Sequence, residues 1–232
     1  EIEMPIRLMM PEGLPLVLSA RIDFGMNLQR QDARGIHMSR LYRILSERCP
    51  TNPLSFEVLS LMASEALKSH EDLSDETKLS IRFALPLERK ALRSEGKGWR
   101  TYPVTLGVHA KRGEKVSLTT AVEVLYSSTC PASAALSRQM HQQAALKHFQ
   151  ADTLTRIELE EYFNAPQSMA ATPHAQRSLA KVNVEWPLDI VGADLFSSIT
   201  KLIDLLETAL GTPVQTLVKR EDEQEFAVRN AE

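Results

Sequence analysis

The sequence predicts an α+β protein with an antiparallel sheet and helices layered on one face. Several segments alternate apolar and polar residues with a period of two, which is typical of strands with one buried face. Other segments repeat apolar residues at helical spacing between proline and glycine boundaries. Glycine-rich phosphate loops are few and there is no strand-helix-strand rhythm, so the pattern disfavours a parallel nucleotide-binding fold.

The first half of the chain predicts the order β-β-α-α-β-β. Its elements are strands at 4–10 and 16–24, helices opening near 35 and 53, and strands at 79–87 and 102–110. Pro11-Glu12-Gly13 is a turn signal between the first two strands. In the strand at 79–87, Ile81, Phe83 and Leu85 fall on one face, which we expect to be buried.

The second half begins a similar order. Its elements are a strand at 115–126, helices at 133–149 and around 157–163, a strand at 178–186, a helix from 195, an extended segment at 214–218 and a helix from 221. Asp194 is a suitable N-cap for the helix from 195, and Gly211 a suitable stop. We therefore expect two tandem units, residues 1–112 and residues 113–232. Either the second unit is C-terminally incomplete, or its parallel with the first is loose.

Composition excludes several classes of function. Of the 232 residues, 43% are hydrophobic and 25% charged, as in ordinary soluble globular proteins. The net charge of −3 disfavours nucleic-acid binding. The two cysteines, Cys49 and Cys130, argue against a disulfide scaffold. Without a long apolar run or a visible signal peptide, we expect a cytoplasmic protein that does not bind membranes.

Cys130 is the first candidate site residue. It lies between the strand at 115–126 and the helix at 133–149, for which Ser133 is a possible N-cap. The positive end of a helix dipole favours the thiolate, which is the nucleophilic and metal-binding form of cysteine. A lone cysteine is nevertheless more often a small buried hydrophobic residue, and spacing alone favours that interpretation.

Two further clusters carry groups that bind metals. His174 follows Thr172-Pro173 and directly precedes a strand, so it is a candidate ligand or general base. The charged run at 219–225 includes Glu223, although a charged helix start explains that run as well. Cysteine, histidine and glutamate together suit a catalytic zinc ion with an open position for water, but their separation along the chain does not show that they meet.

His37 and Arg40 stand at the start of a predicted helix, where unpaired N–H groups favour anions. Capping and ordinary surface charge explain this pair nearly as well.

Four strings, in order, resemble the type IB GTP cyclohydrolases, enzymes of the tunnelling fold. They are the residues at 35–40 (GIHMSR), 126–131 (YSSTCP), 174–178 (HAQRS) and 211–216 (GTPVQT), the last running into 219–226 (KREDEQEF). The resemblance implies two tandem tunnelling-fold units. It also implies hydrolytic opening of the GTP imidazole ring, which gives 7,8-dihydroneopterin triphosphate and formate for tetrahydrofolate biosynthesis.

The resemblance also implies roles for individual residues. Cys130 matches a metal ligand required for catalysis, and His174 and Glu223 match two further metal ligands. Zinc is the expected metal and manganese the second choice. Arg177, with His37 and Arg40, is expected to contact the triphosphate or the ring, because guanidinium groups pair with phosphate.

The resemblance implies a homotetramer with sites between subunits. Ala132 stands where the family has a second cysteine, which is not among the expected ligands. The family's C-terminal region, with its guanine-anchoring glutamate, has no counterpart here, so no residue is assigned as that anchor. Two alternatives stay open: a catalytically silent relative that binds a pterin or a nucleotide, and a purely structural oligomer subunit.

Overall fold

A computed structural model describes residues 1–30, 32–187, 194–213 and 219–231. The elements are β1 (Ile2–Met9), β2 (Pro15–Met26), α1 (Met38–Arg48), α2 (Phe56–Ser69), β3 (Glu76–Lys90), β4 (Lys97–Lys111), β5 (Ser117–Thr129), α3 (Pro131–His148), α4 (Arg156–Asn164), η1 (Pro166–Ser168), β6 (Ala175–Trp186), α5 (Leu195–Leu210) and α6 (Arg220–Arg229). The predicted strands and helices are present, and the extended segment expected at 214–218 lies outside the described residues.

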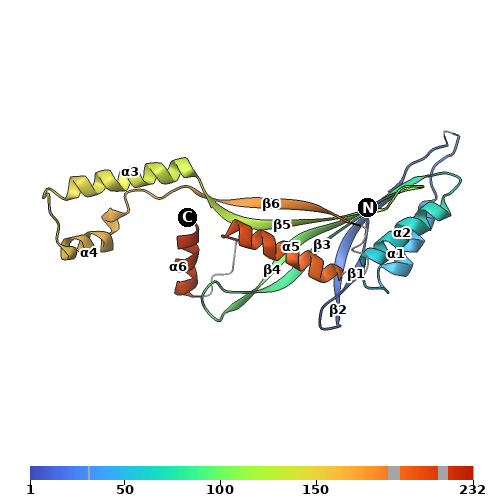
Figure 1. The fold of residues 1–232 in the computed structure, drawn as a ribbon, viewed down its shortest axis with the longest axis horizontal. Coiled ribbons are helices and arrows are strands. Elements are labelled where there is room, and N and C mark those ends of the chain that lie inside the picture. The colour runs from blue at the N-terminus through green and yellow to red at the C-terminus, as the bar shows by residue number, and fades with distance from the viewer. Residues whose placement is uncertain (31, 188–193, 214–218, 232) are drawn as a thin grey trace.

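The six strands form one antiparallel sheet in the order β1-β2-β3-β4-β5-β6, so each strand pairs with the next along the chain (Figure 1). The α+β class predicted from the sequence is confirmed. The alternation in β3 works as expected, because Ile81 and Leu85 are fully buried. The predicted boundary between residues 112 and 113 falls between β4 and β5, which pair through contacts such as Val104 opposite Val122. The two units therefore share one sheet, and their division into domains stays a prediction.

The core lies between the sheet and the helices α1, α2 and α5. Side chains such as Ile22 and Ile81 from the sheet meet Met62 of α2 and Ile199 of α5 in one cluster of buried residues. The helix α5 begins where expected, since Asp194 accepts hydrogen bonds from the N–H groups of Phe196 and Ser197. Among the described residues, no helix is both long enough and apolar enough to cross a membrane.

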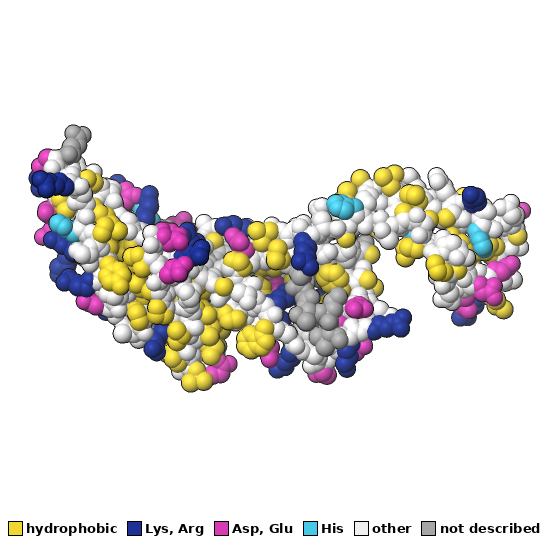
Figure 2. Space-filling model, turned by 180° about the vertical axis from the view of Figure 1, so that it is seen from behind, with side chains coloured by type: hydrophobic (Ala, Val, Ile, Leu, Met, Phe, Trp, Pro, Cys, Tyr) yellow, Lys and Arg dark blue, Asp and Glu magenta, His cyan; other side chains and the backbone are white. Residues whose placement is uncertain are grey.

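The helices that cover the sheet lie on one of its faces, as predicted, and two of the predicted helices extend beyond the sheet. The helices α3, α4 and η1 project beyond the end of the sheet as an arm, defined here as residues 131–168 (Figure 1). Ser137 is the buried residue of α3, and Tyr162, which packs against His148 and Phe149, is the buried residue of α4. The apolar spacing at 133–149 therefore faces no sheet, and hydrophobic side chains such as Leu146 stay exposed on the arm (Figure 2).

The position of the arm changes the interpretation of the second half. Because β5 pairs directly with β6, the arm is an excursion within an antiparallel strand pair. The order β-β-α-α of the first half is then matched by β5, β6, α5 and α6, and not by the two helices of the arm.

Candidate functional site

Cys130 and His174 lie side by side at the base of the arm. The pairing of β5 with β6 ends with Thr129 opposite Ala175, so the residue after β5 faces the residue before β6. The Cys130 N–H donates to the His174 carbonyl oxygen at 3.1 Å. The antiparallel register thus brings together two predicted metal ligands that are 44 positions apart in the sequence. Cys130 is half-buried and His174 is exposed.

The start of α3 differs in detail from the prediction. Cys130 itself occupies the N-cap position, and Pro131 occupies the first turn, where a missing N–H costs nothing. Ser133, the predicted N-cap, instead accepts a hydrogen bond from the His174 N–H through its hydroxyl oxygen at 2.6 Å. The Ser133 side chain therefore ties the loop before β6 to the first turn of α3.

Glu223 lies on α6 and is exposed. The far end of α6 reaches the last residue of β5, directly before Cys130, because Asn230 hydrogen-bonds Thr129. Among the residues that the structure describes, however, no three His, Cys, Asp or Glu side chains lie close enough together to hold a metal ion. One protomer thus pairs Cys130 with His174 but does not join Glu223 to them.

His37 and Arg40 lie at the opposite end of the sheet from Cys130. Their neighbour His70 comes shortly before β3. Near the start of β3, Lys78 pairs with His109 of β4, and His109 pairs with Ser117 at the start of β5. The 13 residues of β5 separate that end from Cys130, and at the rise of an extended strand they span about 40 Å. One protomer therefore cannot bring His37 and Cys130 to the same small ligand (Figure 1).

A buried histidine holds the start of α1. The His70 side chain has no exposed surface, and its Nε2 accepts a hydrogen bond from the His37 N–H at 3.2 Å. Its Nδ1 therefore carries the hydrogen, which faces the Ala66 carbonyl oxygen at 3.1 Å. Arg40 donates from Nη1 to the carbonyl oxygen of Ser69. His70 and Ser69 thus position both predicted substrate contacts, a role for which the sequence carries no motif.

Arg177 is on β6, opposite Ser127, with its side chain exposed. It lies three residues after His174, so among the three predicted substrate contacts it is the one at the Cys130 end of the sheet.

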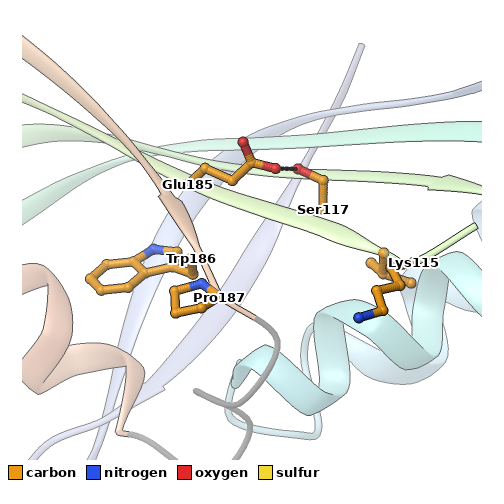
Figure 3. Close-up of a pocket in the computed structure, with 6 residues that line it drawn as sticks. Lys115, Ser117, Glu185, Trp186 and Pro187 are labelled. Carbon is orange, nitrogen blue, oxygen red and sulfur yellow. Dashed lines mark hydrogen bonds between the residues drawn. The ribbon is translucent and has the colours of Figure 1, made fainter.

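A pocket at the other end of the same two strands was not predicted. Its lining residues are Lys115, Val116, Ser117, Glu185, Trp186 and Pro187, and its volume is about 490 Å³. Trp186 and Pro187 lie together on one side, and Lys115 lies across from them (Figure 3). Ser117 donates from its hydroxyl to Glu185 at 2.6 Å, and the Trp186 indole N–H donates to Thr120 Oγ1 at 2.8 Å. This end of the sheet is also the end that carries His37.

Comparison with solved structures places the chain in a fold class. It resembles the crystal structure of uricase from Arthrobacter globiformis with a TM-score of 0.50 and 6% identity, over 97% of this chain and 72% of the uricase chain. Uricase is a tunnelling-fold protein, so the chain has the architecture of that class.

Comparison of sequences gives the family. The family model described as "Type I GTP cyclohydrolase folE2" matches residues 1–232. The GTP cyclohydrolase FolE2 of Bdellovibrio bacteriovorus is 44% identical over all of this chain and 73% of its own length. The GTP cyclohydrolase FolE2 of Pseudoalteromonas translucida is 40% identical over all of this chain and 75% of its own length. The chain belongs to the type I GTP cyclohydrolase FolE2 family.

Proposed function

We propose that the protein is a metal-dependent GTP cyclohydrolase. It opens the imidazole ring of GTP by hydrolysis and forms 7,8-dihydroneopterin triphosphate and formate, for the synthesis of tetrahydrofolate. The observation that carries the proposal is the match to the family over the whole chain, including 44% identity to a named GTP cyclohydrolase. The adjacency of Cys130 and His174 supports it, because both lie in strings that match the family.

The donor chemistry at the base of the arm fits a zinc ion. Thiolate and imidazole are common zinc ligands, and a half-buried Cys130 beside an exposed His174 leaves room for a further ligand and for water. Cys130, His174 and Glu223 would hold zinc or, as the second choice, manganese. Because the three side chains do not meet within the described residues of one protomer, Glu223 would have to come from a second copy of the chain. When bound, such a metal supplies a hydroxide nucleophile near neutral pH. The Ser133 hydroxyl fixes the backbone of His174. Cys130 would be the ligand required for catalysis.

The triphosphate is assigned to the cationic side chains. Arg177, Arg40 and His37 would contact the phosphate oxygens or the purine ring, and the guanidinium groups suit paired hydrogen bonds to phosphate. Because His37 and Arg40 lie about 40 Å from Cys130 in one protomer, a second copy of the chain would have to bring them to the site. We therefore propose a homotetramer with its sites between subunits. Each site would combine the Cys130 end of the sheet of one subunit with the His37 end of the sheet of another. The unpaired cysteines are in keeping with a cytoplasmic location.

The test is turnover by the metal-loaded protein. Zinc-loaded wild-type protein should release formate from GTP, and Cys130→Ala should abolish release while circular dichroism shows an unchanged fold. Cys49→Ala is the matched control, since Cys49 is a buried core residue and its loss should leave turnover in place. Formate release by Cys130→Ala at the wild-type rate would refute the proposal.

A binding protein without turnover would give a different result. GTP would raise the unfolding free energy, by about 2.7 kcal/mol at 100 times its dissociation constant, while no formate appeared. If neither metal nor GTP changed the melting temperature, the purely structural interpretation would hold.

A further inference from the structure

We propose that Asp222 is a positioning residue for the metal site, because it fixes both the location of α6 and the direction in which Glu223 points. The inference rests on the proposed function, in which Glu223 is a metal ligand. Asp222 itself faces away from solvent and is assigned no contact with metal or substrate.

The Asp222 carboxylate is buried at the tip of the β3–β4 hairpin. Its Oδ1 accepts hydrogen bonds from the N–H groups of Arg93 at 2.8 Å and Ser94 at 2.9 Å. Its Oδ2 accepts from the Ser94 hydroxyl at 2.6 Å and from the Lys219 N–H at 3.0 Å. The side chain has no exposed surface. A buried carboxylate is tolerated only with such donors. The three hydrogen bonds from Arg93 and Ser94 attach α6 to the hairpin, and the fourth, from the Lys219 N–H, caps the start of α6.

The other contacts of α6 connect it to the hairpin and to the end of β5, directly before Cys130. Arg93 pairs with Glu225 at 2.7 Å, one turn further along α6. At the end of the helix, the Asn230 amide donates to Thr129 Oγ1 at 2.9 Å, and Thr129 directly precedes Cys130. The eight residue steps from Asp222 to Asn230 span about 12 Å of helix. The helix α6 thus bridges the hairpin tip and the residue before Cys130.

Burial of Asp222 also determines the rotation of α6 about its axis. Neighbouring residues of a helix point about 100° apart. With Asp222 directed into the hairpin, Glu223 is directed away from it, and Glu223 is accordingly exposed. A change at Asp222 would therefore turn or loosen the helix and move the carboxylate of Glu223, without removing any proposed ligand.

The test compares single substitutions in the zinc-loaded full chain. Asp222→Asn replaces one acceptor oxygen with an amino group. Because each carboxylate oxygen accepts at least one backbone N–H, the amino group faces a donor and that hydrogen bond is lost. Substitution of a residue that orients a metal ligand without touching the metal typically lowers metal affinity by about 10- to 100-fold. We expect Asp222→Asn to weaken zinc binding by about 10-fold or more in chelator competition, and to speed hydrogen exchange of residues 220–230 while β5 and β6 stay protected.

Glu221→Gln is the matched control, because it changes an exposed carboxylate in the same turn of α6. It should bind zinc as the wild type does. Ser94→Ala removes one of the four hydrogen bonds and keeps the carboxylate, so it should give a smaller loss of affinity in a chain that still folds.

Glu223→Gln separates the two hypotheses. If Glu223→Gln weakens zinc binding while Asp222→Asn and Ser94→Ala bind zinc as the wild type does, the positioning role is refuted and the proposed ligand set stands. If Glu223→Gln also binds zinc normally, Glu223 is not a ligand, and the role of Asp222 fails with it.

Discussion

Replacing His70 with phenylalanine tests how α1 is held against α2. The phenyl ring is slightly larger than the imidazole ring, so the substitution leaves no cavity at this buried position. It removes the acceptor of the His37 N–H, while the Ala66 carbonyl oxygen keeps its contact with the Ser69 hydroxyl at 2.9 Å. The main loss is therefore one hydrogen bond to a partly buried N–H, which costs about 1–3 kcal/mol when the group is left unpaired.

The expected result is a decrease of about 1–3 kcal/mol in the free energy of unfolding. Urea titration followed by circular dichroism measures it, at a fixed protein concentration because subunit association also stabilises the folded state. His70→Gln is the matched control, since its amide oxygen can reach the place of Nε2 and accept the His37 N–H. We expect it to lose less than about 1 kcal/mol.

Two outcomes would refute this reasoning. A His70→Phe protein as stable as the wild type would show that the His37 N–H needs no protein acceptor. Equal destabilisation of His70→Gln and His70→Phe would show that the shape of the ring, and not its hydrogen bonds, stabilises the start of α1. A kinetic readout follows as well: if His37 and Arg40 bind GTP, His70→Phe should raise KM more than it lowers kcat.

Two further predictions concern the buried side chains of Cys49 and Tyr102. Burial raises the pKa of Cys49 to about 11, so its thiol should react slowly in the native protein. A thiol reagent should therefore label the wild type once, at half-buried Cys130, and should not label native Cys130→Ala. Rapid labelling of both cysteines in the wild type would contradict this. Burial and the Glu207 carboxylate raise the pKa of Tyr102 to about 12. Because the folded-state pKa exceeds the unfolded value of about 10, stability should fall as the pH rises from about 10 towards 12, as melting temperatures would show. Tyr102→Phe should lose this dependence, and an equal slope in both proteins would refute the assignment.

The local elements of the fold could be predicted from the sequence. The alternation in β3 and the apolar stripe of α2 predict which face of each element is buried. This prediction needs only the periodicity of the segment itself. The pairing of Cys130 with His174 was expected from a resemblance to a family. The structure supplies its physical cause, the register of β5 with β6.

The amino-acid sequence alone predicts the strands, the helices, the α+β class and the strings that mark the family. Other features are visible only in three dimensions. The helices α3 and α4 form an arm, and His37 lies at the far end of the sheet from Cys130. His70 and Asp222 fix the starts of the helices that carry proposed site residues. The reason is physical. Periodicity records the environment of neighbouring residues, whereas these placements depend on strand register and on hydrogen bonds between segments distant in the chain, which no local pattern records.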